Sequence, residues 1–310
     1  MRGDISGLSG NSDEKARVAS KIRDACVHVG FFYVQNHGVD NEVIEKVVQA
    51  SHQFFDLPIA EKTNLDIHKS SNFKGYTALL GENTNPENRG DLHEGFDIGP
   101  ETSAEQSDTS MSGHNAWPNP ETSPGFREAV TQYYQAVVDL GLRLFPAFAL
   151  ALNLPQDFFS DKIKKAAAIM RLLHYPPQTG TVDHRIQGIG AHTDYECFTI
   201  LWQDNVPALQ VLSTSGQWVD APPIPGTFVI NIGDQMARWT NDVFKSTVHR
   251  AINRSGIRRY SMPLFFGTDY HVKLEALPSC VSEARPSRYE TVLAGDYVKS
   301  RLEETYAHSK

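Results

Sequence analysis

The stretch Ala191-His192-Thr193-Asp194 organises the interpretation of this chain. Side chains on an extended segment alternate between its two faces, so the imidazole of His192 and the carboxylate of Asp194 would point the same way. One imidazole and one carboxylate make two-thirds of the 2-His-1-carboxylate site that suits non-haem Fe(II). The third ligand must come from another strand, and His249 lies in an apolar-flanked run farther along the chain. Taken alone, the pattern is explained equally well by a His-x-Asp pair that is exposed to solvent or that is buried with hydrogen-bond partners in the core.

The residues that follow His249 favour a site that binds an organic acid. Arg259-Tyr260-Ser261 also alternates, so the guanidinium and the hydroxyl would share one face of a strand. Arginine offers a planar, permanently charged fork that binds a carboxylate through two hydrogen bonds, and serine adds one donor. A metal triad followed by such a clamp is what the binding of a keto acid at iron requires.

The chain around this stretch indicates a jelly-roll fold. Short apolar runs alternate with turn signals, and about eight such strands imply a sandwich or a jelly-roll barrel. The expected strands are 169–175, 189–192, 198–202, 209–212, 218–219, 227–232, 247–252 and 260–266. Apolar residues at helical spacing predict helices at 14–29, 41–55, 126–152, 156–165 and about 288–306. Ser12-x-x-Lys15 lacks the glutamate of a capping box, so no such box is expected at the first helix.

We expect one catalytic domain over residues 1–310, because neither a linker nor an internal repeat divides the chain. Residues 1–165 would form a mainly helical region, 166–275 the jelly-roll core with the metal site, and 276–310 a C-terminal helix. Residues 81–123 are polar and rich in Gly and Pro. Loops of that length within a compact domain are usually functional, which predicts a lid over the site.

Composition sets broad limits on function. The 310 residues carry a formal net charge of −8 and are 40% hydrophobic, as expected for an ordinary globular protein that does not bind nucleic acid or anionic membranes. The three widely spaced cysteines indicate reduced thiols rather than a disulfide or zinc framework. We see no apolar run of about 18–20 residues and no signal-peptide pattern, which predicts a cytoplasmic protein.

In order and spacing, His192-x-Asp194, His249 and Arg259-x-Ser261 resemble the motif of the 2-oxoglutarate/Fe(II)-dependent dioxygenases, within the subgroup that includes isopenicillin N synthase. The resemblance covers nearly the whole chain, and its other matching segments are Gly30-Phe31-Phe32-Tyr33-Val34, Asn36-His37-Gly38, Tyr175-Pro176 and Asn231-Ile232-Gly233-Asp234. The combination is far more specific than any one segment. It implies a double-stranded β-helix, the cupin-like jelly roll, with an N-terminal helical layer.

The resemblance also implies the roles of the residues. His192, Asp194 and His249 would bind Fe(II), and Arg259 and Ser261 would bind the distal carboxylate of the cosubstrate 2-oxoglutarate, assisted by Tyr175. With O2, the enzyme would oxidise a small organic metabolite and release succinate and CO2. Hydroxylation is the default outcome, whereas desaturation, ring closure and ring expansion remain open. The core resembles microbial members from secondary metabolism; the substrate and the oligomeric state are not specified.

Two further residues are assigned to the substrate. Arg171 shares a strand face with Tyr175, so it would bind an acidic group of the substrate or cosubstrate; a salt bridge at the barrel rim explains it equally well. Phe198, in the strand after the metal pair, is the second. His93 and Glu94 are interpreted as surface or lid residues, because the triad is complete without them.

Two other functions remain open at this stage. The same fold and triad also serve oxidases that use no 2-oxoglutarate, of the isopenicillin N synthase type or dependent on ascorbate. More remotely, a zinc hydrolase or a non-catalytic jelly-roll binder would share the spacing. A hydrolase should need a general base near the metal-bound water, and we identify no glutamate that adjoins either ligand segment.

Overall fold

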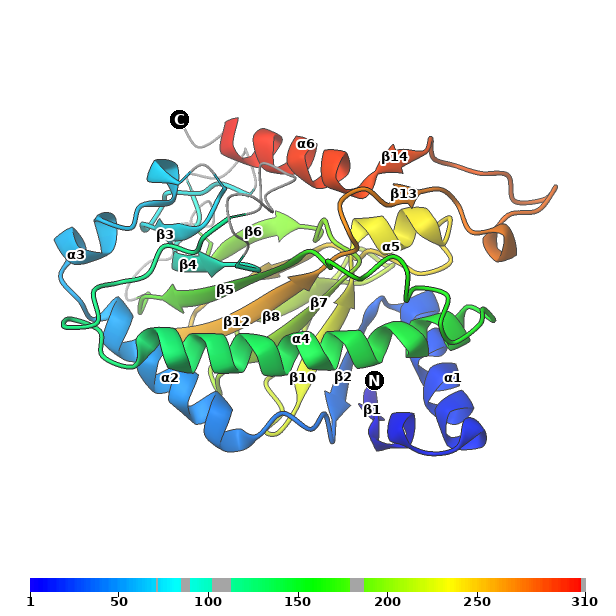
Figure 1. Cartoon of the computed structure of the whole chain (residues 1–310), viewed down its shortest axis with the longest axis horizontal. Coiled ribbons are helices and arrows are strands. Elements are labelled where there is room, and N and C mark those ends of the chain that lie inside the picture. The colour runs from blue at the N-terminus through cyan, green and yellow to red at the C-terminus, as the bar shows by residue number, and fades with distance from the viewer. Residues whose placement is uncertain (71, 85–89, 102–112, 179–186, 308–310) are drawn as a thin grey trace.

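Two β-sheets form the centre of the molecule, which is described by a computed structural model (Figure 1). The structure describes residues 1–70, 72–84, 90–101, 113–178 and 187–307. Within them, an eight-stranded sheet has the order β1-β2-β10-β7-β12-β5-β4-β3. Its strands are β1 (Arg2–Asp4), β2 (Phe31–Gln35), β10 (Phe228–Ile232), β7 (Phe198–Gln203), β12 (Arg259–Phe266), β5 (Ala168–Tyr175), β4 (Glu94–Ile98) and β3 (Gly75–Thr77).

The smaller sheet covers one face of the larger one. It has the order β6-β11-β8-β9 and consists of β6 (Ile189–His192), β11 (His249–Ala251), β8 (Leu209–Leu212) and β9 (Trp218–Asp220). Side chains of both sheets pack together, for example Phe31 and Val229 of the large sheet with Leu209 and Val211 of the small one. The predicted jelly-roll core with mixed α+β structure is confirmed.

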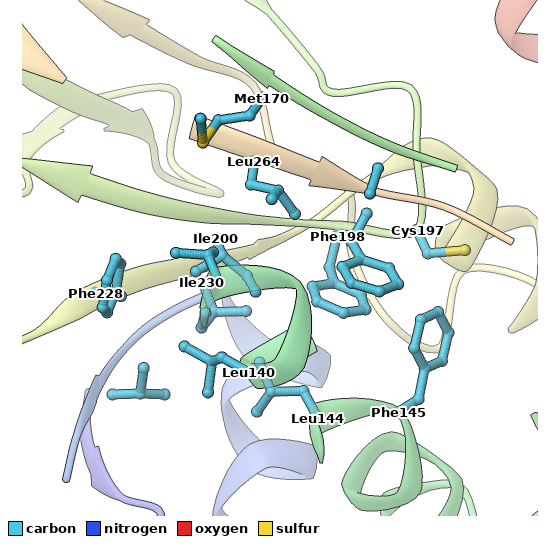
Figure 2. Packing of buried hydrophobic residues seen from close by; sticks show 14 of the residues in the cluster. Leu140, Leu144, Phe145, Met170, Cys197, Phe198, Ile200, Phe228, Ile230 and Leu264 are labelled. Carbon is cyan, nitrogen blue, oxygen red and sulfur yellow. The ribbon is translucent and has the colours of Figure 1, made fainter. Parts of the chain in front are cut away.

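Helices cover the other face of the large sheet. The long helix α4 (Phe126–Ala151) runs across it, flanked by α1 (Ser12–His28) and α2 (Asn41–Phe55) (Figure 1). Leu140, Leu144 and Phe145 of α4 pack against alternate side chains of the sheet (Figure 2). By length and composition α4 would also be able to cross a membrane, but half of its most apolar window is buried, as in a core helix.

The remaining α-helices and strands of the described residues lie around the edges of the two sheets (Figure 1). They are α3 (Ile59–Thr63), α5 (Asp234–Trp239), the pair β13 (Lys273–Leu274) and β14 (Val292–Leu293), and α6 (Ala294–Ala307). The last helix therefore begins at residue 294 and not near 288. The helix expected at 156–165 is wrong, because those residues form successive turns. The expected lid at 81–123 includes residues 85–89 and 102–112, which lie outside the described residues.

The N-terminus of α1 corrects the expectation that it has no capping box. The side chain of Asn11 accepts hydrogen bonds from the backbone N–H groups of Asp13 and Glu14, and Glu14 accepts one from the N–H of Asn11. The reciprocal pair is a capping box one residue earlier than the serine that the sequence suggested.

Candidate active site

The pairing of two short strands brings two distant histidines together. β6 and β11 run antiparallel, and His192 lies directly opposite His249 in their register. Their ring centroids are 4.3 Å apart. Asp194 follows two residues after the end of β6, and the ligand atoms of His192, Asp194 and His249 all lie within 4.8 Å of one another. The structure thus brings together the three predicted metal ligands.

Backbone contacts orient both imidazole rings toward Asp194. Nδ1 of His192 lies 2.7 Å from the carbonyl oxygen of Gly190, and Nδ1 of His249 lies 3.2 Å from that of Thr247. A carbonyl oxygen only accepts hydrogen bonds, so each Nδ1 carries the proton. In the neutral form of each ring, Nε2 is therefore the lone-pair nitrogen, and the two lie 3.5 and 3.6 Å from Oδ1 of Asp194.

Hydrogen bonds to Oδ2, the oxygen that faces away from the histidines, fix the orientation of the Asp194 carboxylate. Its Oδ2 accepts a hydrogen bond of 2.7 Å from the amide of Asn231 and another from the hydroxyl of Thr199, so Oδ1 faces the imidazoles. Burial alone would raise the pKa of Asp194, but the histidines and Asn231 hold it below its usual value. The carboxylate is therefore ionised.

The two imidazoles titrate differently. Burial lowers the pKa of His249 to about 4, and the nearby His192 adds to this effect. Burial also acts to lower the pKa of His192, but the hydrogen bond and charge of Asp194 outweigh it and raise that pKa. Two nitrogen donors and one carboxylate oxygen that converge from one side match the ligand set that Fe(II) takes in non-haem oxygenases.

A second polar group lies on the large sheet. β12 pairs with β5 so that Arg259 lies opposite Tyr175 and Ser261 opposite Leu173. The guanidinium lies 4.7 Å from the centre of the Tyr175 ring. Ser261 Oγ lies 3.4 Å from Nη1 of Arg259 and 3.3 Å from the Tyr175 hydroxyl. The structure brings together the three residues predicted to bind the cosubstrate.

Arg259 is almost completely buried, at 1% exposure, among neutral acceptors. Its Nε donates to the carbonyl oxygen of Val206 at 3.2 Å, and Nη2 donates to the side chain of Gln203 at 3.1 Å. In the described part of the chain, no carboxylate forms an ion pair with Arg259; Asp204 interacts with it only through space, and the Asp204 oxygens accept from the backbone N–H groups of Val206 and Tyr260 instead. A buried charge without a counter-charge in direct contact is costly, which makes this position ready for an anion.

One cavity of about 180 Å³ joins the two groups and lies between the sheets. Residues from both sheets line it, including Thr199 and Leu201 of β7. The assignment of Phe198 to the substrate is wrong. Its side chain is completely buried on the opposite face of β7, where it packs against Phe145, Phe148 and Phe266 (Figure 2). Because side chains alternate along a strand, Phe198 and Thr199 cannot both face the cavity.

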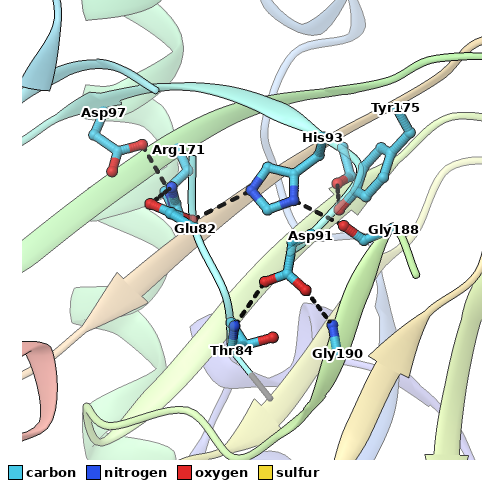
Figure 3. A network of polar contacts seen from close by, with 10 residues as sticks. Glu82, Thr84, Asp91, His93, Asp97, Arg171, Tyr175, Gly188 and Gly190 are labelled. Atoms are coloured by element: carbon cyan, nitrogen blue, oxygen red, sulfur yellow. Dashed lines mark hydrogen bonds and ion pairs between the residues drawn. The ribbon is translucent and has the colours of Figure 1, made fainter. Parts of the chain in front are cut away.

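Arg171 faces the cavity as the strand alternation predicted, but carboxylates already hold it (Figure 3). Its Nε donates to Asp97 at 2.8 Å, and Nη2 donates to Glu82 at 2.7 Å. The salt-bridge explanation is therefore the one the structure supports. Sequence reasoning missed both acids: Asp97 alternates with Gly95 on β4 and offered a weak signal, whereas Glu82 in its irregular segment offered none.

His93 and Glu94 lie outside the metal cluster, as expected, but neither is a surface residue. His93 Nδ1 lies 2.8 Å from the carbonyl oxygen of Gly188, and Nε2 lies 3.3 Å from Glu82 (Figure 3). Glu94 is buried on the other face of β4, where Lys62 and Tyr76 each donate a hydrogen bond of 2.6 Å to it. These interactions replace the surface or lid roles that the sequence suggested.

The expectation that no glutamate adjoins the ligand segments is also wrong. Glu196 lies two residues after Asp194, lines the cavity, and is 4% exposed. Burial raises the pKa of its carboxyl group to about 8. The absence of a nearby glutamate therefore cannot serve as an argument against a hydrolase.

Comparisons with known proteins address the family directly. Residues 166–268 match the model of the 2OG-Fe(II) oxygenase superfamily, and residues 3–120 match the model described as non-haem dioxygenase in morphine synthesis N-terminal. The 2-oxoglutarate-Fe(II) type oxidoreductase hxnY of Emericella nidulans is 37% identical over 96% of this chain and 87% of its own length.

Solved structures agree with the sequence relatives. A full-length Neurospora crassa protein crystallised with alpha-KG has a TM-score of 0.90 at 30% identity, over 98% of this chain and 96% of the other. The same protein crystallised with alpha-KG and thymine has a TM-score of 0.88 at 29% identity, with the same coverage.

Proposed function

This chain belongs to the 2OG-Fe(II) oxygenase superfamily and is a 2-oxoglutarate-dependent dioxygenase that uses Fe(II) and O2, and we propose that it hydroxylates a small organic molecule in the cavity between its sheets. The observation that carries this proposal is the convergence of His192, Asp194 and His249 on a cavity that also buries Arg259. The similar Neurospora crassa protein crystallised with thymine supports a small-molecule substrate.

We assign the iron to Nε2 of His192, Oδ1 of Asp194 and Nε2 of His249. Bound iron and 2-oxoglutarate together supply an oxidant strong enough to break a C–H bond, and the cosubstrate leaves as succinate and CO2. Asn231 and Thr199 keep Oδ1 of Asp194 turned toward the two imidazoles. The carbonyl groups of Gly190 and Thr247 fix the imidazole tautomers, so the donor atoms are positioned before a metal arrives.

Arg259 and Ser261 supply the carboxylate site. The guanidinium fork would form paired hydrogen bonds with the distal carboxylate of 2-oxoglutarate, and the hydroxyls of Ser261 and Tyr175 lie beside it. The face of Tyr175 covers the guanidinium and keeps water from it. The rest of the cavity, between this clamp and the metal ligands, would hold the substrate and shield the reaction from solvent.

Iron binding tests the assignment of the ligands. Asp194→Ala removes the only anionic donor of the three, so we expect it to lose most of its Fe(II) content and all substrate turnover while it remains folded. The measurement is iron per protein after reconstitution, together with succinate formed and oxygen consumed. Asp220→Ala is the matched control, because Asp220 lies on β9 and hydrogen-bonds Gln210 instead. A variant at 194 with stoichiometric iron and full turnover would refute the ligand set.

The same assay separates the proposed reaction from an oxidase. Oxygen consumption should require 2-oxoglutarate and should yield one succinate per O2. Turnover that continues without 2-oxoglutarate would show that the carboxylate site binds something else.

A further inference from the structure

Asp97 places a buried acceptor on the wall of the cavity. It lies opposite Arg171 in the pairing of β4 with β5, and both side chains line the cavity (Figure 3). Oδ1 of Asp97 accepts from Nε of Arg171 at 2.8 Å. Among the residues that the structure describes, none donates a hydrogen bond to its Oδ2. The side chain is only 7% exposed and lines the cavity, so a ligand in the cavity can supply the donor that the described residues do not.

The charges around Asp97 select the kind of partner that this oxygen can take. Two carboxylates, Asp97 and Glu82, hold the guanidinium of Arg171 from two sides. Arg171 therefore has its counter-charges within the protein and is not available to anchor a carboxylate of the substrate. A negatively charged group brought next to Oδ2 would meet like charge in a buried place, which is unfavourable.

Apolar side chains also line this part of the cavity. Ile169 and Leu173 lie on β5 on either side of Arg171, and Phe265 on β12 lines the same space. Gly95, opposite Leu173, leaves room, because a Cβ there would lie 3.3 Å from both Arg171 and Leu173. The wall thus combines one carboxylate oxygen that has no donor among the described residues with apolar side chains from β5 and β12.

We propose that the cavity takes a nitrogen-containing substrate, neutral or cationic, that donates an N–H to Oδ2 of Asp97, and that it rejects compounds with a carboxylate at this position. This inference rests on the proposed function, because it names the substrate class of that same cavity. Asp97 is a specificity residue in this scheme: it contacts the substrate but takes no part in the oxidation.

The first test is equilibrium binding of a defined panel, measured by ligand-observed NMR on the full chain with iron and 2-oxoglutarate under argon. The panel contains five- and six-membered lactams, cyclic ureas and cyclic amines, each beside its N-methylated counterpart and a ring carboxylic acid of similar size. We expect at least one N–H compound to bind tenfold or more tightly than its N-methylated counterpart and its acid. If no N–H compound does so, or if an acid binds best, the proposal is wrong.

The second test reverses the polarity of the acceptor. In Asp97→Asn the amide oxygen must face Arg171, since a guanidinium only donates, so the amide nitrogen takes the place of Oδ2. The tenfold preference for N–H compounds should disappear, and compounds that only accept hydrogen bonds should bind more tightly than they do to the unchanged protein. Glu94→Gln is the matched control, because Glu94 is a buried acid of the same strand that faces Lys62 and Tyr76, away from the cavity.

The outcomes separate this inference from the proposed function. Unchanged selectivity in Asp97→Asn, or an equal change in Glu94→Gln, would overturn the role of Asp97. A protein that binds N–H compounds selectively but forms no succinate would contradict the proposed reaction and leave the specificity intact. A protein that turns over 2-oxoglutarate without this selectivity would contradict the specificity and leave the proposed reaction intact.

Discussion

Arg259 and Arg171 occupy the same cavity in opposite electrostatic settings. They lie on the paired strands β12 and β5, and both line the space between the sheets. Arg171 is held by two carboxylates, whereas neutral oxygens and the Tyr175 ring surround Arg259. The difference shows that the residue type alone does not identify an anion site. What identifies it is a buried guanidinium whose counter-charge is supplied by the ligand.

Removal of the Arg259 charge should have the largest effect on the cosubstrate. In Arg259→Leu the distal carboxylate of 2-oxoglutarate would be buried unpaired, at a cost of roughly 3–5 kcal/mol, or about a hundred- to several thousandfold in affinity. We expect the KM for 2-oxoglutarate to rise accordingly in a titration that follows succinate. Arg258→Leu is the control, because Arg258 is exposed and pairs with Asp56. An unchanged KM in Arg259→Leu would remove the distinction between the two arginines.

The reciprocal change at Arg171 should affect stability and not the cosubstrate. Arg171→Leu leaves Glu82 and Asp97 buried without their counter-charge, and we expect a loss of about 3 kcal/mol in the free energy of unfolding. The KM for 2-oxoglutarate should change less than about twofold. Denaturant unfolding and the same succinate titration measure the two quantities. A large KM change with little loss of stability would reverse the assignment of the two arginines.

A triple variant sharpens this second prediction. Arg171→Leu combined with Glu82→Gln and Asp97→Asn removes all three charges, so most of the lost stability should return. If the triple variant is less stable than Arg171→Leu alone, repulsion between unpaired acids is not the cause of the loss.

The sequence predicted the placement of site residues that lie close together in the chain. His192 with Asp194, and Arg259 with Ser261, are each two residues apart, and alternation along an extended segment is sufficient to place each pair on one face. The facing of Arg171 toward the cavity followed from the same rule. His249 was predictable as the third ligand because it lies in a strand-like run and because the resemblance to a known family supplied its role.

The remainder depended on contacts that the sequence does not encode locally. The partners of Arg171 come from β4 and from an irregular segment before it, so the choice between a substrate anchor and a salt bridge required the fold. Phe198 was assigned wrongly because alternation fixes which residues share a face but not which face is the core. The apolar ring then packs against α4, and Thr199 takes the cavity side.

Arg259→Lys gives a smaller effect and tests the geometry of the clamp. Lysine keeps the positive charge but loses the planar fork, and its compact ammonium group cannot donate to Val206, Gln203 and a carboxylate with the same geometry. We expect the KM for 2-oxoglutarate to rise about tenfold, which corresponds to roughly 1.4 kcal/mol, with kcat little changed. A kcat loss at constant KM would mean that Arg259 acts on the reaction step and not on cosubstrate binding.

The smallest predicted effect belongs to Ser261, which touches both Arg259 and Tyr175. Its hydroxyl oxygen lies 3.4 Å from the guanidinium and 3.3 Å from the Tyr175 hydroxyl, so both contacts are long, and a bound carboxylate would be the better partner for the serine proton. Ser261→Ala should therefore cost about 1 kcal/mol, or roughly fivefold in the KM for 2-oxoglutarate, with no loss of stability beyond that of the exposed control Ser282→Ala. If the KM stays constant while the protein is destabilised, Ser261 serves the packing around Arg259 and the guanidinium alone binds the cosubstrate.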